Sequence, residues 1–517
     1  MTRDEMIIRI EEKQLWDIII IGGGATGAGI ALDSASRGYK SLLLESGDFA
    51  QGTSSRSTKL IHGGVRYLQQ GNISLVMEAL KERGILRKNA PHLVHNLRFV
   101  VPRYDWWQGP FYGIGLKVYD MLAGKEGFGN SEIISKKETL KHIPTVEQEG
   151  LDGGIIYYDG QFDDARLVIN LVKTAAEQGG VLINYMPVSA LVKKSGLVKG
   201  VIAADLESGK EYQLNANVVI NAAGPFSDEV RMMDEPDCIP MISPSQGVHI
   251  VLDRSFLPGD SAIMVPHTDD GRVLFAIPWH NKIIVGTTDT PLQKSEIEPI
   301  PSEQEIDFLL EHAARYLSKD PTRQDVLSVF AGIRPLVTNP EAENTAVISR
   351  EHVVHISKSG LVTIAGGKWT TYRKMAEDTL DQAIIIGQLE YTPCLTSDIQ
   401  IHGYHKHTEN FGSLACYGSD AIEIQNITKN DKKLGEKLHP QLEYIGAEVI
   451  WAVREEMALN INDFFSRRSR ALFLHAKASV EAAPLVAELM MKELNKERKW
   501  KKEQIDSFNK TAENYIL

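Results

Sequence analysis

The chain has 517 residues, 43% hydrophobic and 24% charged, a composition typical of a soluble globular protein with more than one domain. Its net charge of −12 argues against nucleic-acid binding over the whole surface. The three cysteines (Cys238, Cys394 and Cys416) are odd in number and lack metal-ligand spacing, so we expect neither a disulfide framework nor a metal site. No apolar stretch approaches the roughly 18 residues of a membrane span, and the N-terminus lacks a signal-peptide pattern. We therefore expect a cytoplasmic protein whose membrane contact is at most peripheral.

The first elements form a nucleotide-binding pattern. An apolar strand at 16–21 is followed by Gly22-Gly23-Gly24-Ala25-Thr26-Gly27, a Gly-x-Gly-x-x-Gly turn, and by a helix at 28–37. A second strand, 41–45, ends in Glu45, close to the roughly 20-residue spacing of the acid that binds a ribose hydroxyl. Because glycine N–H groups at a helix N-terminus suit a pyrophosphate, this unit predicts dinucleotide binding. The alternative is a glycine turn in an ordinary βαβ unit.

Further segments of the same domain follow at a distance. Asp163-Asp164-Ala165 opens a helix with an apolar stripe, and three strands are expected at 181–193, 198–205 and 211–221. The last strand ends in Asn221-Ala222-Ala223-Gly224-Pro225, where small residues let the backbone approach a ligand closely. This order indicates one nucleotide domain built from scattered segments.

From about residue 240 to 336 the pattern changes to short β-rich runs. Strands are expected at 247–252, 273–279 and 283–288, with Asn281-Lys282 as the hairpin turn between the last two. These runs predict an antiparallel, substrate-facing sheet.

The chain then returns to strands at 353–357 and 361–365, to Gly366-Gly367-Lys368-Trp369-Thr370-Thr371, and to a helix at 372–386. Beyond residue 390 the pattern is mostly helical, and the list of expected helices is 447–459, 463–476 and 480–492. We expect a separate helical domain there.

Two long motifs are far more specific than the glycine turn. They are Ser57-Thr58-Lys59-Leu60-Ile61-His62-Gly63-Gly64-Val65-Arg66-Tyr67 and the run from Gly366 to Arg373. With Gly286-Thr287-Thr288-Asp289 and Gly332-Ile333-Arg334-Pro335-Leu336, they occur in order between about residues 16 and 380. In these motifs the chain resembles the FAD-dependent, quinone-linked glycerol-3-phosphate dehydrogenases of the D-amino-acid-oxidase-like flavoprotein superfamily. It has no Asp-x-Asp-x-Asp-Gly loop resembling the calcium-binding extension of mitochondrial members.

The resemblance implies an α/β fold class: a Rossmann-like FAD-binding domain, an antiparallel β-sheet substrate domain and a C-terminal all-helical domain. The oxidoreductase region is expected at 1–390, with FAD-binding segments at about 14–105, 150–235 and 340–390. Substrate-binding segments are expected at about 106–149 and 236–339, and the helical domain at 391–517.

The implied activity is oxidation of sn-glycerol 3-phosphate to dihydroxyacetone phosphate by hydride transfer to non-covalently held FAD, with electrons passed to membrane quinone. The alternatives are an oxygen-using glycerol-3-phosphate oxidase, an amine or amino-acid oxidase of the superfamily, and a non-catalytic flavin-binding protein. The implied partners are a lipid surface at the cytoplasmic membrane and a second copy in a homodimer.

Two segments are candidates for membrane docking. Aromatic, apolar and cationic residues suited to an interface occur at 103–122, namely Arg103, Trp106, Trp107, Phe111, Tyr112, Leu116 and Lys117. An ordinary packed loop and helix explains them equally well. For the basic tail at 496–502, which contains Trp500, a solvated helix end is the better interpretation.

The resemblance gives substrate roles to residues whose types suit the chemistry. Arg66 and Arg334 fit a phosphate clamp because the planar guanidinium binds phosphate oxygens in pairs. Tyr67 is a weaker candidate for a substrate hydrogen bond. His249 fits the base for the C2 hydroxyl, while Arg334 could instead stabilise the developing alkoxide. Without the resemblance, the arginines would be read as surface groups and His249 as a core histidine.

Lys368 is expected to place a fixed positive charge near the substrate or flavin N5, at the start of a helix whose dipole favours the anionic reduced flavin. A solvated loop lysine is the alternative, and Thr370 and Thr371 could be simple helix caps. The full set of expected cofactor contacts is Gly22, Gly24, Ala25, Thr26, Gly27, Glu45, Thr53, Ser54, Ser55, Lys59, Leu60, His62, Gly63, Val188, Ala223, Gly224, Gly332, Gly367, Lys368, Trp369 and Thr370.

Overall fold

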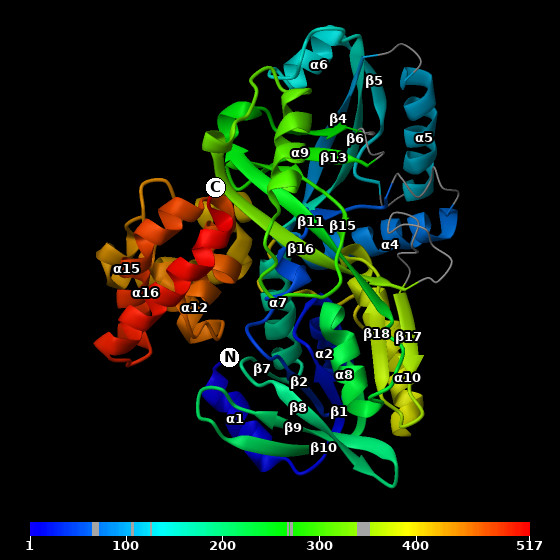
Figure 1. The fold of residues 1–517 in the computed structure, drawn as a ribbon, viewed down its shortest axis with the longest axis vertical. Helices are drawn as coiled ribbons and strands as arrows, with labels where there is room; N and C mark the ends of the chain where they lie inside the picture. Colours follow the sequence, from blue (N-terminus) through cyan, green and yellow to red (C-terminus); the bar gives the residue numbers. More distant parts are fainter. Residues whose placement is uncertain (65–71, 105–107, 125–126, 266–267, 269–271, 339–351) are drawn as a thin grey trace.

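The computed structural model describes residues 1–517 except 65–71, 105–107, 125–126, 266–267, 269–271 and 339–351, and without the side chains of 108–114 and 123 (Figure 1). Two β-sheets stand one above the other in this view, and the helical C-terminal domain lies on the left side of the second sheet. Six helices whose bounds are not given below are α1 (Arg3–Glu12), α4 (Ile73–Asn89), α5 (Gln108–Ala123), α8 (Ser227–Asp234), α11 (Ala421–Asn430) and α13 (Ile461–Asp463).

The first sheet carries the glycine turn. Its strands run in the order β17 (His352–Ile356), β18 (Val362–Gly366), β10 (Glu211–Asn221), β1 (Trp16–Ile21), β2 (Ser41–Leu44) and β7 (Val181–Ile183). All neighbours are parallel except β17 and β18. Helix α2 (Ala25–Ser36) contacts α7 (Asp164–Glu177) and α10 (Tyr372–Gly387), which keeps the isoleucines of β1 out of water. This is the expected Rossmann-like layer of one sheet assembled from distant segments.

The strand expected at 181–193 is two strands. β7 ends at Ile183, and β8 (Val188–Lys194) pairs instead with β9 (Leu197–Ala204), which pairs with β10. Tyr185, with a φ of 55°, and Pro187 stand between them, and a residue in the left-handed region followed by a proline interrupts an extended run.

The second sheet is mostly antiparallel. Its strands run in the order β15 (Thr290–Pro291), β11 (Ile242–Asp253), β14 (Lys282–Gly286), β13 (Leu274–Trp279), β12 (Ser261–Val265), β4 (Val94–Arg103), β6 (Gly153–Phe162) and β3 (Leu60–Ile61), with β16 (Val326–Val337) beside β11 and β5 (Glu132–Ser135) beside β6. β12 and β4 are parallel, so the sheet is mixed. Helices α6 (Lys136–His142) and α9 (Glu303–Ala314) pack on it.

Two details of this sheet differ from the sequence prediction. Strands β3, β4 and β6 belong to it by hydrogen bonding, although they come from segments assigned to FAD binding. The hairpin turn lies at His280 and Asn281, one residue earlier than expected. Both turn residues have positive φ, 43° and 59°, as a tight two-residue hairpin requires.

The C-terminal domain packs α12 (Gly446–Glu455), α15 (Ala476–Glu493) and α16 (Arg498–Ala512) around an apolar core. The continuous helix predicted at 463–476 is broken into α13, a π-helical turn at Phe464–Arg468 and α14 (Ala471–Leu474). Arg470 interrupts it with a φ of 66°. The physical reason is electrostatic: Arg467 and Arg468 both bind Asp48 of the first domain, which pulls this stretch out of a regular helix.

Candidate active site

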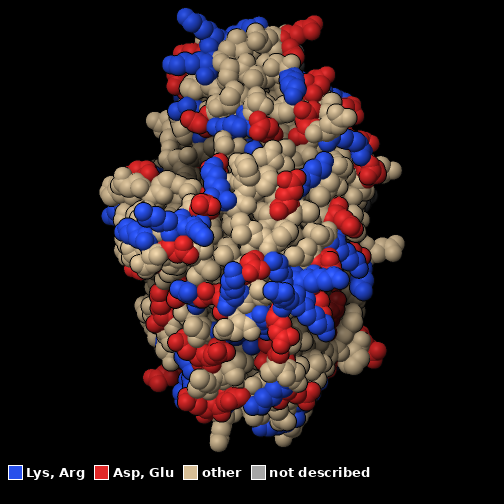
Figure 2. Space-filling model, turned by 90° about the vertical axis from the view of Figure 1, so that its left-hand side faces the viewer, with Lys and Arg blue, Asp and Glu red and all other residues tan. Residues whose placement is uncertain are grey.

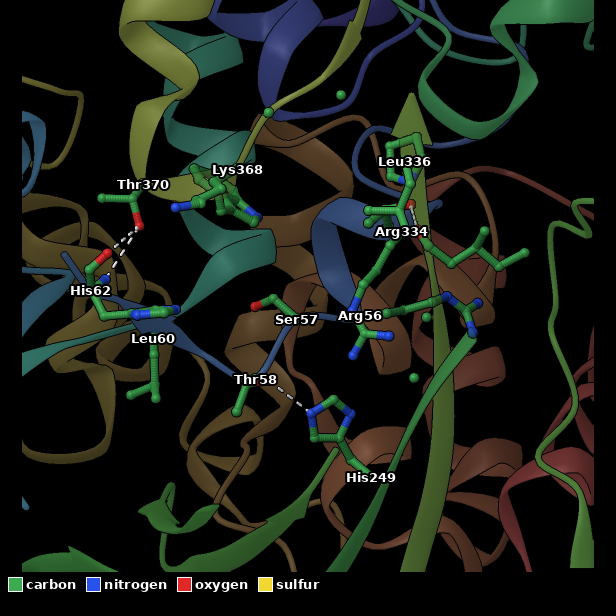
Figure 3. Close-up of a pocket in the computed structure, with 18 of the residues that line it drawn as sticks. Arg56, Ser57, Thr58, Leu60, His62, His249, Arg334, Leu336, Lys368 and Thr370 are labelled. Atoms are coloured by element: carbon green, nitrogen blue, oxygen red, sulfur yellow. Dashed lines mark hydrogen bonds between the residues drawn. The ribbon is translucent and has the colours of Figure 1, made fainter. Parts of the chain in front are cut away.

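A cavity of about 210 Å³ opens between segments of both sheets (Figure 3). Its walls come from η1 (Thr53–Ser55) and the residues after it, from β3, β11 and β16, and from the turn that joins β18 to η6 (Trp369–Thr371). Ten predicted site residues meet there: Thr53, Leu60, His62, His249, Gly332, Arg334, Gly367, Lys368, Trp369 and Thr370.

The glycine turn has the shape that a dinucleotide needs. Gly22 has a φ of 108°, and a Cβ there would lie 2.6 Å from the Ala222 carbonyl oxygen. A Cβ on Gly27 would lie 1.8 Å from the carbonyl oxygen of Gly22. These glycines let α2 and β10 pack against the turn. The N-cap residue of α2 is Gly24, which has no side chain with which to cap the helix. The turn therefore presents backbone at a helix N-terminus at the carboxyl end of β1, where parallel sheets bind phosphates.

Polar groups hold the rim of this turn. The Glu45 carboxylate accepts hydrogen bonds from the Gly23 N–H at 2.6 Å and the Gly47 N–H at 2.8 Å, and burial raises its pKa. The Ser54 hydroxyl accepts from the Ala25 N–H at 2.8 Å. Glu45 and Ser54 thus lie at the turn, as the sequence predicts for residues near the ribose and pyrophosphate.

The turn after β18 joins the polar segment that begins at Thr53. The Trp369 indole donates to the Ser54 carbonyl oxygen at 3.0 Å. The His62 N–H donates to the Thr370 hydroxyl at 3.2 Å, and that hydroxyl also lies 3.4 Å from the His62 carbonyl oxygen (Figure 3). Thr370 therefore tethers His62, and the helix-cap interpretation of Thr370 and Thr371 does not hold, because neither makes a side-chain cap.

Arg334 lies on β16 with its guanidinium held in place. Nη1 pairs with Asp289 at 3.1 Å and Nη2 donates to the Thr288 carbonyl oxygen at 3.0 Å. The Ser245 hydroxyl also donates to Asp289. The Gln246 carbonyl oxygen and the Thr287 hydroxyl accept from the same two Nη atoms, so the protein fixes the orientation of the guanidinium.

His249 lies on β11 between the strands β14 and β16. Its Nε2 lies 2.9 Å from the Thr58 hydroxyl (Figure 3). Its ring stacks on Phe330 with centroids 4.8 Å apart. Burial, then the charges of Lys59 and Arg334, holds the pKa of His249 well below 6.5. The imidazole is therefore neutral at neutral pH and can accept a proton.

Other predicted residues lie elsewhere. Arg66 and Tyr67 fall outside the described residues. Lys59 is fully buried, and its ammonium bonds to Asp164 at 2.6 Å because that carboxylate offsets the cost of burying the charge; its cofactor contact stays a prediction. Ser55 is also buried, with its hydroxyl turned to the Gly52 carbonyl oxygen. Val188 begins β8 and packs, half-buried, against the core of the first domain.

Several residues that line the cavity were not predicted. They are Arg56, Ser57, Thr58, Gly247, Phe275, Ile333, Pro335, Leu336 and Gly366. Arg56 pairs with Glu298 at 2.7 Å and is almost fully buried. Arg56 and Thr58 belong to the polar segment that the sequence marked as functional. Which side chains of this segment face the cavity depends on β11 and β16, which come from much later in the chain. In the described part of the chain, no group of three His, Cys, Asp or Glu could hold a metal ion.

Comparison with known proteins agrees with this geometry. Residues 17–373 match the family described as FAD dependent oxidoreductase, and residues 362–505 match the C-terminal domain of alpha-glycerophosphate oxidase. Mitochondrial glycerol-3-phosphate dehydrogenases of Macaca fascicularis and Mus musculus are each 43% identical over 98% of the chain, which spans 75% and 74% of their lengths.

A solved structure agrees as well. The glycerol-3-phosphate dehydrogenase of Bacillus halodurans complexed with FAD is 32% identical, with a TM-score of 0.81 over 100% of this chain and 98% of its own. The glycine cradle at the N-terminus of α2 and the acidic rim fit FAD. The chain belongs to the FAD-dependent oxidoreductase family, and within it to the glycerol-3-phosphate dehydrogenases.

Proposed function

We propose that the chain oxidises sn-glycerol 3-phosphate at C2 to dihydroxyacetone phosphate and passes the electrons to membrane quinone. The observation that carries this proposal is one cavity that is lined by Arg334, Lys368 and a neutral His249. Two cations suit a phosphate and a developing alkoxide, and a neutral imidazole suits a hydroxyl proton. Relatives named for this activity support the same conclusion.

The proposed roles follow from the contacts. Arg334 orients the substrate and stabilises negative charge on the C2 oxygen, because Asp289 and the Thr288 carbonyl hold its fork rigid. The Thr58 hydroxyl, 2.9 Å from Nε2 of His249, gives its proton to that nitrogen as it receives the C2 hydroxyl proton, so His249 is the base and Thr58 the relay. Bound FAD supplies the acceptor for the hydride that leaves C2, so one C–H and one O–H bond break as the C=O bond forms. Lys368 adds positive charge at the start of η6.

An oxygen-using glycerol-3-phosphate oxidase is the second candidate, because the C-terminal match is to a domain described for alpha-glycerophosphate oxidase. The two activities differ only in how reduced flavin is reoxidised. Stopped-flow reoxidation by a quinone analogue should be much faster than by dissolved oxygen. Faster reoxidation by oxygen would make the chain an oxidase.

An amine or amino-acid oxidase is less well supported. The solved glycine oxidase of Geobacillus kaustophilus has a TM-score of 0.55 at 19% identity, so it shares the fold alone. Two cations at the cavity favour a phosphate over a carboxylate. Turnover of sarcosine or glycine without turnover of glycerol phosphate would reverse this choice.

Peripheral lipid contact is proposed at the pair of helices α4 and α5. Ile73 and Met77 on α4 and Met121 on α5 are 50%, 52% and 73% exposed, and the helices pack against each other. No helix in the described segments is long and apolar enough to cross a membrane. Exposed apolar side chains on neighbouring helices suit insertion at an interface. Residues 105–107 of the predicted docking segment lie outside the described chain.

The basic tail is less suited to lipid. Its lysines pair with acids: Lys496 with Glu207, Lys499 with Glu503 and Lys501 with Glu488. Figure 2, which views the side that carries the C-terminal helices, shows Lys and Arg interspersed with Asp and Glu. Location at the cytoplasmic membrane and assembly as a homodimer remain predictions; co-sedimentation with liposomes and light scattering would test them.

The decisive experiment is an anaerobic titration of the holoenzyme. sn-Glycerol 3-phosphate should bleach the bound flavin, whereas glycerol and sarcosine should not. Arg334→Ala should retain FAD but reduce the flavin at least about 10²-fold more slowly, the usual cost of losing one oxyanion-stabilising group.

Arg334→Lys is the matched control, since it keeps the charge and loses the fork. If Arg334 acts chiefly on the alkoxide, kcat should fall more than KM rises; a pure phosphate clamp should show the reverse. Normal bleaching of Arg334→Ala would remove Arg334 from the mechanism.

A further inference from the structure

Arg470 and the helix α14 of the C-terminal domain lie behind residues close to the cavity, where they contact Ser55 and Phe330. Arg470 and Phe473 are both 1% exposed, although neither lines the cavity. Each begins a chain of contacts that ends at His249. The first chain is made of hydrogen bonds, and the second of aromatic rings.

The first chain starts at the Arg470 guanidinium. Its Nη2 donates to the Ser55 carbonyl oxygen at 2.6 Å and to Asp164 Oδ1 at 3.1 Å. Asp164 is the first residue of α7 and is fully buried. Arg470 of the C-terminal domain thus binds both the loop that contains Ser55 and the carboxylate of Asp164 in the first domain.

Asp164 in turn binds the loop that carries Thr58. Its Oδ2 accepts from the Ser57 N–H at 3.1 Å, from the Ser57 hydroxyl at 2.7 Å and from the Lys59 ammonium at 2.6 Å. Thr58 lies between these two anchored residues, and its hydroxyl lies 2.9 Å from Nε2 of His249. The position of that hydroxyl therefore depends on Asp164.

The second chain is a row of rings. The Phe473 ring meets Phe330 edge to face, with centroids 5.0 Å apart and planes at 62°. Phe330 in turn stacks on His249 at 4.8 Å and 13°. On the other side of His249, strand β14 packs closely on the ring: a Cβ on Gly286 would lie 2.2 Å from it. The His249 ring therefore cannot shift toward β14. Movement of Phe473 is transmitted to His249 because the packing between them is close.

His249 has little else to fix its orientation. Its Nδ1 is buried and has no hydrogen-bond partner among the residues that the structure describes. Imidazoles that act as bases are ordinarily oriented through the second nitrogen. Here the Thr58 contact and the stacked ring must supply the orientation.

We propose that Arg470 and Phe473 are positioning residues for His249, so that the C-terminal domain takes part in substrate oxidation. The proposal rests on the proposed function, in which His249 accepts the substrate proton. It assigns to this domain a role in proton transfer through two sets of contacts, which meet where the Arg470 guanidinium lies 4.3 Å from the centroid of the Phe473 ring.

The direction of the effect on pH dependence follows from what surrounds His249. Lys59 from the loop before β3 and Arg334 from β16 face it with positive charge, and burial excludes water. Loosening the ring row admits water, which favours the charged imidazolium and raises the pKa of His249. Because only the neutral ring accepts a proton, the low-pH limb of the rate profile should then move to higher pH.

Phe473→Leu is the first test, since it keeps apolar bulk and removes the ring edge. The matched control is Phe508→Leu: Phe508 is equally buried in the same domain and stacks on Phe465, not on Phe330. In anaerobic stopped-flow of holoenzyme, Phe473→Leu should slow flavin reduction by sn-glycerol 3-phosphate about tenfold or more, with the low-pH limb displaced upward. Phe508→Leu should leave the rate and the profile unchanged.

Arg470→Lys tests the first chain, because one ammonium cannot reproduce the fork between Ser55 and Asp164. Arg470→Lys should slow flavin reduction and move the low-pH limb of the rate profile to higher pH. If Phe473→Leu fails to bind FAD, the result for Arg470→Lys decides whether the positioning role holds. In a double-mutant cycle, Phe330→Leu and Phe330→Leu/Phe473→Leu should reduce flavin equally fast, since both lack the same ring row.

The outcomes separate the two proposals. If wild-type flavin is not bleached by sn-glycerol 3-phosphate, the proposed function fails. If it is bleached, but Phe473→Leu and Arg470→Lys match Phe508→Leu in rate and profile, the positioning role fails. Equal slowing in all three variants, with an unmoved profile, also overturns it, because that pattern reports only general loosening of the domain.

Discussion

The first sheet and the interface with the C-terminal domain are equally buried but are stabilised by different interactions. At the centre of the sheet, Ile18, Ile19 and Ile20 of β1 are 0% exposed and contribute only hydrocarbon. At the interface, Asp48 is also 0% exposed, but it receives both Arg467 and Arg468. Hydrocarbon packing tolerates small changes, whereas a buried charge depends on each partner. The interface should therefore be the more fragile of the two regions.

Further buried pairs extend this charged interface. Arg166 of α7 pairs with Glu456, with both side chains 1% exposed. Arg470 pairs with Asp164 at 3.1 Å. These pairs place the C-terminal domain in one orientation on the first domain, and that orientation also sets the contacts that lead to His249.

Asp48→Ala should cause the largest loss of stability. It removes the carboxylate that Arg467 and Arg468 share, and breaking such a buried pair typically costs about 3–5 kcal/mol. Arg467 keeps Asp463 at 2.7 Å, but among the described carboxylates Arg468 keeps only Glu456 at 3.7 Å. The free energy of unfolding of the holoenzyme in urea would measure it. Asp48→Asn, which keeps the shape and one acceptor oxygen, should lose less. A loss below about 1 kcal/mol for Asp48→Ala would show that the charges do not hold the interface.

The same contrast explains what could be predicted from the sequence. The β1 strand, the glycine turn and α2 follow from an apolar run and a glycine spacing, and the structure confirms all three. The break at Arg470 could not be predicted, because residues 463–476 have a helical pattern and the partner that distorts them, Asp48, lies more than 400 residues earlier. Local patterns contain no information about such distant charge pairs.

The cavity shows the same division. Residue type and motif were enough to predict that His249, Arg334 and Lys368 would lie together, and they do. The opposite case is Lys59, which sits in the most specific motif yet turns its ammonium away to Asp164. Side-chain direction in an irregular loop depends on partners from other segments, so Thr58 and Lys59 could not be told apart beforehand.

His92 gives the interface a dependence on pH that the apolar sheet lacks. It is fully buried, Asn170 donates to its Nε2 at 3.0 Å, and burial lowers its pKa to about 3. The pKa of His92 is near 6.5 in the unfolded chain and about 3 in the folded chain. Its contribution to the free energy of unfolding is therefore fully present above pH 6.5 and falls as the pH drops toward 3.

The measurement is urea unfolding of wild type and His92→Gln at two pH values. From pH 7 to pH 5 this one histidine should cost wild type about 2 kcal/mol, and His92→Gln should lose less over the same interval by that amount. Equal losses in the two proteins would mean that His92 is not held neutral.

Ile19→Val should have the smallest effect and completes the comparison. It removes one methylene from β1, where Ile19 pairs with Val219 and Leu42 of the flanking strands. Such a change typically costs about 1 kcal/mol, because neighbouring side chains close part of the space. The loss in urea unfolding should be the same at pH 7 and pH 5, since the group removed is uncharged in both the folded and the unfolded chain. A loss as large as that of Asp48→Ala would mean that the sheet is no more tolerant than the charged interface.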